Sequence, residues 1–228
     1  MVFVEVFVGT SGWSYDWNRG RSLDWYLGSA GLDAMELNAS FYRFPPPARV
    51  AGWAVKGRGI RWCVKVHRYI THLHRFNEIG RRSWERFLSL FAPLDSLTDW
   101  YLFQAPPSLR DTGRLADFFA DLPRRDKCVL EIRNRELLLN DTACEKLQEH
   151  VPLVSVDSPD AANRIFDGRV VYLRMHGRGD WYRHDYSPQE LEETAARVRQ
   201  SGAEKAYIFF NNDTAMLANA RRMKEIFR

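Results

Sequence analysis

The chain has 228 residues, of which 45% are hydrophobic and 27% charged, with a formal net charge of +4. This length suits one sizeable core, and the composition is that of a globular protein, which excludes disordered and fibrous classes. No apolar run approaches the roughly 20 residues of a membrane-spanning helix, so we expect no membrane association. We expect a single domain over residues 1–228.

The start of the chain and the cysteines indicate where the protein works. Residues 1–8 are apolar but carry Glu5 and lack a basic flank and a cleavage site, which predicts a first strand rather than a signal peptide. Cys63, Cys128 and Cys144 are odd in number and widely spaced, so neither a metal site nor a disulfide framework follows from them. Buried free thiols fit a reducing compartment, and we expect a cytoplasmic protein.

Eight short apolar runs recur along the chain and predict strands. In chain order they cover residues 3–9, 35–37, 62–66, 100–103, 128–132, 151–156, 170–175 and 206–210. Helical patterns alternate with these runs, which favours an α/β fold and specifically a closed, parallel, eight-stranded (β/α)8 TIM barrel. Because such barrels typically need about 250 residues, this one must have short or trimmed helices.

The helical patterns differ in the signals that bound them. The expected helices cover residues 23–28, 47–55, 81–91, 113–122, 141–150, 160–167, 188–200 and 214–226. Ser187-Pro-Gln-Glu190 is the clearest start, with a capping serine, a proline in the first turn and a glutamate at the capping-box position. The stretch 160–167 is the weakest, since it offers only about two turns. Residues 68–80 form a long connection rich in His and Arg.

Most of the predicted strands end in polar residues that share a side-chain parity. Because alternate residues of a strand point to the same face, each pair is expected to point into the upper lumen of the barrel. The pairs are Glu36 and Asn38, Lys65 and His67, Glu131 and Arg133, Arg174 and His176, and Asn211 and Asp213. Such groups either neutralise one another in a structural network or bind something charged. Stability alone would be served at least as well by apolar residues.

The strand-exit motifs together resemble those of a known family, the "domain of unknown function 72" proteins. The motifs are Gly9-Thr-Ser-Gly-Trp13, Glu36-Leu-Asn-Ala-Ser-Phe-Tyr-Arg43, Lys65-Val-His-Arg-Tyr-Ile-Thr-His72, Gln104-Ala-Pro-Pro107, Glu131-Ile-Arg133, Val156-Asp-Ser-Pro159, Tyr172-Leu-Arg-Met-His-Gly177 and Phe209-Phe-Asn-Asn-Asp213. They occur in order over nearly the whole chain. The resemblance implies a TIM barrel with a cleft and no established reaction.

The resemblance is closest in a core set of charged residues and weaker just after the fifth strand. The matching set is Glu36, Glu131, Arg133, Asp157, Arg174 and His176. Asn134 and Leu137 stand where the family usually has a His and a Trp. This departure weakens a substrate-contacting role for those two positions.

The polar residues at the strand exits predict acid–base chemistry of a hydrolytic kind. Glu131 and His176 are the expected acid–base pair, because histidine titrates near neutral pH and a carboxylate can accept or donate the second proton. Asp157 and Glu36 are expected to orient them or to act as alternative bases.

The expected substrate-binding residues are of three kinds and point to an anionic, ring-containing substrate such as a phosphoester, nucleotide or nucleic acid. Arginines offer fork-shaped donors for an anion, lysine is a point cation, and aromatic rings can stack on a base or sugar. The set is Arg43, Arg133, Arg174, Arg178, Lys65, Trp13, Tyr15, Tyr42, Trp181 and Tyr182, completed by Asn38, His67, Gln104, Asn211 and Asp213.

Two alternatives stay open at this point. A divalent metal could be held by Glu131, Asp157, His176 and either Asn211 or Asp213, as in metal-dependent sugar isomerases or barrel endonucleases, although the neighbouring arginines would repel it. No other cofactor is predicted. A non-catalytic binding module is the second alternative, because residues 56–86 carry nine Lys or Arg against two Glu. That stretch fits nucleic acid, or is a solvated helix face. The sequence predicts no oligomeric state.

Overall fold

The computed structural model describes residues 4–228, so the expected strand start at residue 3 lies outside the described part. Contacts divide the chain into two compact units, each described here by itself. Unit 1 comprises the described residues up to Glu36, Gly59–Arg61 and Val154–Arg228; unit 2 comprises Leu37–Arg58 and Trp62–Leu153. The single domain expected for the whole chain stays a prediction.

Unit 1 is built on a mostly parallel sheet. Its strands are β1 (Glu5–Thr10), β2 (Ala34–Leu37), β6 (Ser155–Ser158), β7 (Ala161–Arg164), β8 (Val170–Met175) and β9 (Lys205–Phe210). Their order is β2-β1-β9-β8-β6-β7, and only β7 runs antiparallel to its neighbour in this set. The carboxyl ends of the parallel strands therefore meet at one edge of the sheet.

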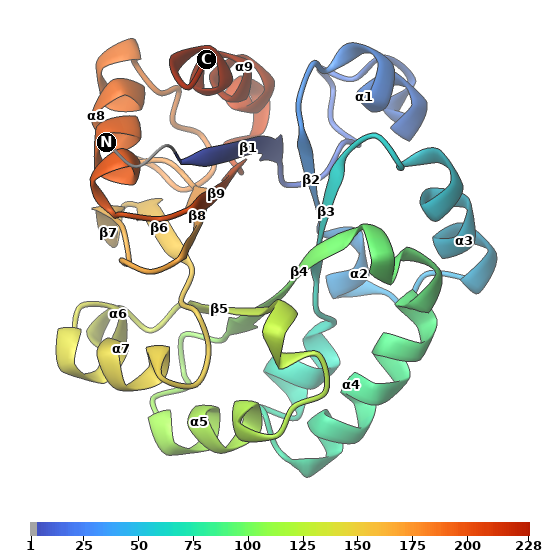
Figure 1. Ribbon diagram of the computed structural model, residues 1–228, viewed down its shortest axis with the longest axis vertical. Coiled ribbons are helices and arrows are strands. Elements are labelled where there is room, and N and C mark those ends of the chain that lie inside the picture. Colours follow the sequence, from blue (N-terminus) through green and yellow to red (C-terminus); the bar gives the residue numbers. More distant parts are fainter. Residues whose placement is uncertain (1–3) are drawn as a thin grey trace. The chain divides into compact units, whose positions relative to one another are not determined.

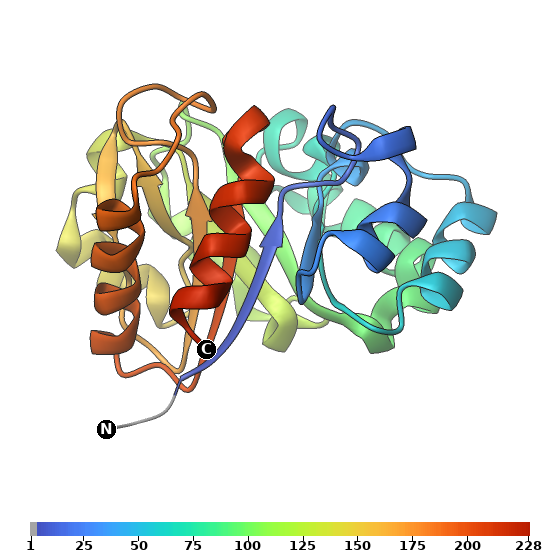
Figure 2. The same cartoon turned by 90° about the horizontal axis from the view of Figure 1, so that it is seen from above.

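Two long helices of unit 1 follow the last two parallel strands. The helical segments are η1 (Arg19–Arg21), α1 (Leu23–Ser29), α8 (Pro188–Gln200), η5 (Asp213–Ala215) and α9 (Met216–Ile226). Helices α8 and α9 lie side by side, and α9 packs on β1 and β9 (Figures 1 and 2). The predicted capping box is confirmed, since Ser187 Oγ accepts from the Glu190 N–H and the Glu190 carboxylate accepts from the Ser187 N–H.

Unit 2 has three parallel strands and most of the helices. The strands are β3 (Arg61–Lys65), β4 (Thr98–Ala105) and β5 (Cys128–Ile132), in the order β3-β4-β5. The helical segments are α2 (Ala39–Tyr42), α3 (Pro47–Lys56), η2 (Tyr69–Leu73), α4 (Glu78–Phe91), η3 (Ala92–Leu97), α5 (Thr112–Ala120), η4 (Arg125–Lys127), α6 (Arg135–Leu138) and α7 (Asp141–Gln148). Segment η2 is a π-helical turn.

The core of unit 2 is aromatic and follows the predicted periodicity of α4. Trp84, Phe87 and Phe91 recur at helical spacing and are fully buried. The Trp84 ring meets the Tyr101 ring of β4 edge to face, with 5.1 Å between centroids. Its indole N–H donates to the Pro123 carbonyl at 2.9 Å, so the polar edge of the ring is satisfied inside the core.

One predicted helix is wrong. Residues 160–167 do not form a helix; Ala161–Arg164 instead form β7, which pairs antiparallel with β6. The side chains of β6 accept the backbone N–H groups that a helix would have used: Asp157 Oδ1 accepts from Asn163 at 2.6 Å and Ser155 Oγ accepts from Phe166 at 2.9 Å. Asn163 adopts a positive φ of 50°, which breaks helical geometry.

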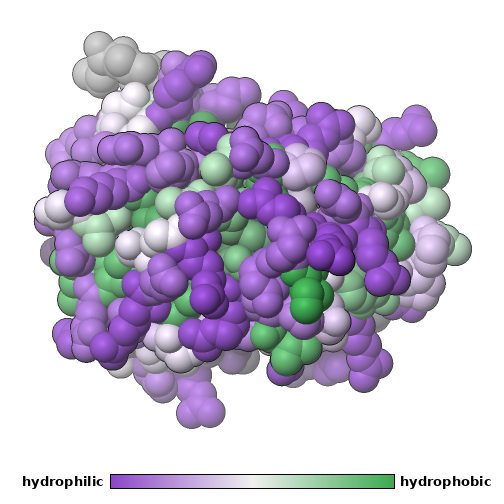
Figure 3. Space-filling model, turned by 90° about the horizontal axis from the view of Figure 1, so that it is seen from below, coloured by the Kyte–Doolittle hydropathy of each residue, from purple (hydrophilic) through white to green (hydrophobic). Residues whose placement is uncertain are grey.

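The barrel prediction is supported only in its coarser form. Both units are α/β with parallel strands, whereas a closed eight-stranded barrel is not shown. Within residues 4–228, no helix is both long and apolar enough to cross a bilayer. The surface in Figure 3 is largely hydrophilic, with hydrophobic side chains exposed in small groups.

Cys63 and Cys128 are buried free thiols, as their place in strand runs predicted, and Cys144 is a third. Cys63 lies in β3, Cys128 in β5 and Cys144 in α7, so all three belong to unit 2. Burial raises the pKa of the Cys128 thiol well above its ordinary value.

Candidate active site

Unit 2 gathers charged residues at the carboxyl ends of its three strands. We call this set the β3–β5 cluster; its members are Lys65, His72, Gln104, Glu131 and Arg133. Gln104 and Glu131 lie opposite each other in the β4–β5 register, so their side chains share a face of the sheet. The Glu131 carboxylate is fully buried and accepts from Gln104 Nε2 at 2.5 Å, while its other oxygen lies 2.8 Å from Arg133 Nε. Both carboxylate oxygens are thereby held in place.

The rest of the cluster comes from the end of β3 and from the π-helical turn. Lys65 ends β3, is only 7% exposed, and places its Nζ 4.2 Å from the centroid of the Phe41 ring. The His72 ring meets the edge of the same Phe41 ring, with 5.1 Å between centroids, and one ring nitrogen lies 2.8 Å from Thr71 Oγ1. Burial lowers the pKa of His72 to about 4, helped by the positive charge of Lys65. The imidazole is therefore neutral near pH 7.

The β3–β5 cluster combines the groups that acid–base chemistry on an anion requires. A fixed carboxylate can take or give a proton, and the guanidinium and ammonium groups can neutralise charge on a bound anion. The neutral imidazole can accept a hydrogen bond or a proton. Because Glu131 and Lys65 are buried, their electrostatic interactions are stronger than at a surface.

The other predicted residues of unit 2 lie nearer the surface. Tyr42 is 65% exposed and Arg43 is also exposed, both at the end of α2. His67 accepts the Tyr69 N–H at Nδ1 and is half-buried. Asn38 precedes α2, and its buried Oδ1 accepts no hydrogen bond from any residue of the described range 4–228. The structure therefore leaves Asn38 with acceptor capacity and assigns Tyr42 and Arg43 to the exterior.

In unit 1, Glu36 and Arg174 are paired with each other inside the sheet. Both side chains are fully buried, and the Arg174 guanidinium donates two hydrogen bonds to the Glu36 carboxylate, from Nε at 3.0 Å and from Nη2 at 2.8 Å. Tyr172 Oη and Ser11 Oγ each donate to the same carboxylate at 2.7 Å. Four hydrogen bonds saturate Glu36, so the geometry favours a structural network here over the substrate contact expected of Arg174.

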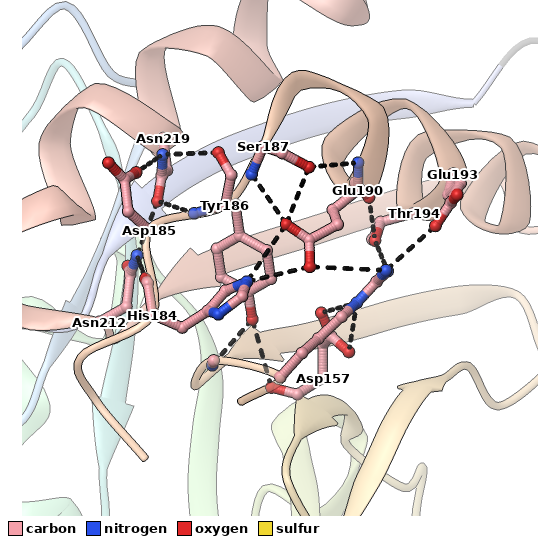
Figure 4. Close-up of polar contacts among 12 residues, drawn as sticks. Asp157, His184, Asp185, Tyr186, Ser187, Glu190, Glu193, Thr194, Asn212 and Asn219 are labelled. Atoms are coloured by element: carbon pink, nitrogen blue, oxygen red, sulfur yellow. Dashed lines mark hydrogen bonds and ion pairs between the residues drawn. The ribbon is translucent and has the colours of Figure 1, made fainter. Parts of the chain in front are cut away.

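The buried Asp157 and the half-buried Arg178 form a second ion pair, which reaches helix α8. Figure 4 shows Asp157 together with Glu193 and Thr194 of that helix. The Asp157 carboxylate is fully buried and accepts from Arg178 Nε at 3.0 Å. The guanidinium continues to Glu193 at 3.0 Å and to Thr194 Oγ1 at 3.2 Å. Arg178 thus ties the exit of β6 to α8. The orienting role of Asp157 and anion binding by Arg178 stay predictions.

The loop that follows β8 is fastened at both ends. Gly177 has a φ of +107°, and a Cβ there would lie 2.5 Å from the Asp180 carbonyl oxygen, so the turn requires glycine. The Gly177 N–H donates to Tyr186 Oη at 2.8 Å, and the Tyr182 N–H donates to the His176 carbonyl at 2.7 Å. These bonds hold the loop over the end of β8.

His176 is the titratable group enclosed beneath this loop. Its ring is fully buried, with the Trp181 ring centroid at 5.3 Å and the Tyr182 ring at 5.7 Å. Asn211, which follows β9, lies 3.2 Å from His176 Nδ1. With Asn211 Nδ2 as the donor, Nδ1 is the acceptor and the proton sits on Nε2. His176 and Glu131 belong to different units, and their predicted pairing stays a prediction.

Two buried asparagines close the base of the loop and were not predicted. Asn212 Nδ2 donates to the His184 carbonyl at 2.8 Å and to Asn219 Oδ1 at 2.7 Å. Asn219 Nδ2 in turn donates to Asp185 at 2.9 Å (Figure 4). Asp213, which the parity argument favoured, is exposed, with a φ of 49° at the start of η5. The chain turns after β9, so strand parity no longer holds there.

The remaining predicted aromatics lie after β1. Tyr15 Oη donates to the Ser11 carbonyl at 3.1 Å and its ring stacks on Trp17 at 5.7 Å. The Trp13 carbonyl accepts from Asn18 Nδ2 at 2.7 Å. Both predicted side chains are half-buried.

The metal alternative gains no support from the side-chain arrangement. Across residues 4–228, no three or more His, Cys, Asp or Glu side chains form a group that could hold a metal ion. Of the ligand set considered from the sequence, Glu131 belongs to unit 2, whereas Asp157 and His176 belong to unit 1, so that set stays a prediction.

Comparison with solved structures defines the class of fold. A xylose isomerase domain-containing protein from Salmonella typhimurium matches with a TM-score of 0.52 at 12% identity, covering 86% of each chain. This likeness supports a TIM-barrel-like α/β fold and nothing more specific. Two DUF72 family proteins match more closely. The one from Enterococcus faecalis has a TM-score of 0.78 at 21% identity, covering 97% of this chain and 95% of its own. The one from Thermotoga maritima has a TM-score of 0.76 at 22% identity, with coverages of 97% and 98%.

The family follows from the sequence itself. A family model described as "Protein of unknown function DUF72" matches residues 7–228, so the chain belongs to that family. The resemblance predicted from the strand-exit motifs is thereby confirmed. A search of curated proteins finds no match.

The residue of the β3–β5 cluster that sequence reasoning missed is His72. The spacing of His72 and His74 is wrong for one helix face, so they read as loop residues. The sequence signal that could have pointed to His72 is the strand-exit motif from Lys65 to His72, whose end lies in the π-helical turn η2. Such turns are frequent at functional sites.

Proposed function

We propose that this protein is an enzyme, hydrolytic in type, that performs acid–base chemistry on an anionic, ring-containing substrate such as a phosphoester or nucleotide. The observation that carries the proposal is the β3–β5 cluster. A buried carboxylate, Glu131, accepts a hydrogen bond from Gln104 and lies 2.8 Å from the nearly buried Arg133, and the buried Lys65 ends another strand of the same unit. Burying such groups is costly, and apolar residues would stabilise the unit at least as well.

Each member of the cluster has a distinct role in the proposal. Glu131 transfers the proton, since Gln104 and Arg133 already fix its orientation. Lys65 and Arg133 bind the anionic group of the substrate and stabilise charge that develops on it. His176, beneath the loop of unit 1, is proposed as a second proton carrier. We further propose a closed (β/α)8 barrel, which the likeness to a xylose isomerase domain-containing protein supports, and a cytoplasmic location, which the three free thiols support.

The test is a screen of phosphoesters, nucleotides and oligonucleotides for turnover, repeated with Glu131→Gln. Removing a general acid or base lowers the rate by about 10²–10⁴-fold, so Glu131→Gln is expected to lose at least about a hundredfold in kcat. Glu136→Gln is the matched control, because this side chain of the same unit is 74% exposed. Its rate is expected to equal that of the wild type.

Turnover separates catalysis from mere binding. In an enzyme, Lys65→Met is expected to raise KM for the anionic substrate, and Glu131→Gln is expected to lose turnover while its binding stays nearly intact. A non-catalytic binding module would also lose affinity in Lys65→Met and tolerate Glu131→Gln, but its wild type would bind the anion without turning it over. That result would refute the proposal.

A further inference from the structure

The outer surface of unit 2 carries a groove that the proposed reaction does not use. It is lined by Phe44, Tyr69, Ile79, Arg82, Ser83 and Arg86 and encloses about 490 Å³. We call it the α4 groove. None of its lining residues belongs to the β3–β5 cluster.

One wall of the groove is a single face of helix α4. Ile79, Arg82, Ser83 and Arg86 stand at positions i, i+3, i+4 and i+7, which places them on the same side of the helix. The start of α4 packs closely on η2, where a Cβ at Gly80 would lie 3.2 Å from the Ile70 carbonyl oxygen. This close contact fixes Tyr69 of η2 beside the helix.

The groove exposes hydrophobic surface that includes flat rings. Phe44 is 45% exposed, Tyr69 38% and Ile79 48%. The Phe44 ring stacks on His67 with 4.2 Å between centroids and 22° between planes, so one ring face is held by the protein. Exposed rings of this kind mark binding surfaces more often than scattered aliphatic residues do.

The charge of the groove is positive. Arg82 and Arg86 line it, and no acidic residue does. Arg82 lies 3.6 Å from Glu78, whereas Arg86 forms no ion pair with any residue of the described chain 4–228. Arg68, in the turn before Tyr69, adds another exposed guanidinium. Two of the nine basic residues of 56–86, Arg82 and Arg86, thus line the groove beside the exposed rings.

We infer that the α4 groove binds single-stranded nucleic acid. Bases stack on Phe44 and Tyr69, and the phosphates between them pair with Arg82 and Arg86. An acidic peptide would match the charge but would leave the rings without a stacking partner, and all the cations named here are arginines, whose planar fork matches phosphate. The inference does not depend on the proposed reaction, because it uses a different surface.

The experiment is fluorescence anisotropy with a labelled single-stranded oligouridylate of about 12 nucleotides, measured over a series of salt concentrations. Phe44→Ala and Tyr69→Ala are each expected to weaken binding by about fivefold or more, as the loss of one stacked base does. The double variant Arg82→Ala/Arg86→Ala removes two phosphate contacts. It is expected to flatten the slope of log K against log salt by about 1.4.

The matched control is Arg169→Ala/Arg222→Ala, which removes the same charge from exposed positions of unit 1. It is expected to bind as the wild type does. The inference is overturned if the oligonucleotide does not bind at low salt, or if the control weakens binding as much as the groove variants. It is also overturned if Phe44→Ala weakens binding of polyglutamate rather than of RNA, which would indicate an acidic protein partner. The arginine variants alter only exposed side chains, so they remain informative even if Phe44→Ala fails to fold.

Discussion

Replacing Arg174 with alanine tests whether the Glu36–Arg174 pair holds the fold or serves a ligand. The guanidinium is fully buried and makes two hydrogen bonds to Glu36, whose carboxylate also accepts from Tyr172 and Ser11. Arg174→Ala leaves this carboxylate buried without its countercharge and opens a cavity beside it. The expected outcome is therefore a large loss of stability.

The magnitude follows from the geometry. Removing one partner of a buried ion pair costs about 3–5 kcal/mol, a large share of the about 5–15 kcal/mol that stabilises an average protein. The double variant Glu36→Gln/Arg174→Met removes both charges and nearly conserves volume. It is expected to recover more than half of the loss, because no buried charge is left unpaired.

Urea unfolding, followed by far-ultraviolet circular dichroism and by tryptophan fluorescence, measures the free energy of unfolding when both signals give one transition. Arg169→Ala, which removes an 84% exposed arginine, is the control and should change little. A loss below about 1 kcal/mol in Arg174→Ala, the range of surface pairs, would refute the structural reading. Arg174 would then be available to an anion, as the sequence alone indicated.

Three further predictions concern titration and the backbone. His72 has a pKa of about 4 in the folded protein against an ordinary 6.5, so the unfolded chain binds the proton first and the free energy of unfolding falls as the pH drops from 6.5 toward 4. His72→Gln should remove this part of the pH dependence of Tm. A His72 ring that titrates near 6.5 by NMR would contradict the prediction. Burial alone raises the pKa of Glu190, but hydrogen bonds from Ser187 outweigh it and hold the pKa in the folded protein below the ordinary 4.5. These hydrogen bonds therefore stabilise the folded protein above pH 4.5, and this stabilisation is lost as the pH falls through the pKa of the folded state. Glu190→Gln should flatten the acid limb of urea stability; an unchanged limb would show that the capping box contributes nothing there. Gly177→Ala places a Cβ 2.5 Å from the Asp180 carbonyl oxygen at a φ of +107°, so it should cost at least about 1 kcal/mol in thermal unfolding, and a wild-type Tm would mean that the turn can relax.

The strands and most helices could be predicted because their signals are local. Mostly apolar runs of five and six residues mark β5 and β8, and the capping box marks α8. The helix expected at 160–167 failed because its backbone N–H groups bond to Asp157 and Ser155, side chains of the preceding strand. The amino-acid composition of residues 160–167 does not indicate that side chains outside the segment bond to its backbone N–H groups.

The candidate site could be predicted only in part. Strand parity correctly grouped Glu131 with Arg133, and the structure joins them at 2.8 Å. Strand parity could not reveal that the Arg174 guanidinium forms an ion pair with Glu36, because that contact joins residues 138 positions apart. It also missed His72, whose role depends on a π-helical turn that has no clear sequence signature.

The distribution of sulfur has a practical use. All three cysteines lie in unit 2 and none in unit 1, and each is sealed from solvent in the native state. A thiol-reactive dye can modify them only when that part of the molecule opens. The rate at which the dye labels the unaltered chain therefore reports the rate at which unit 2 opens transiently. Unit 1 has no cysteine and does not contribute to this rate.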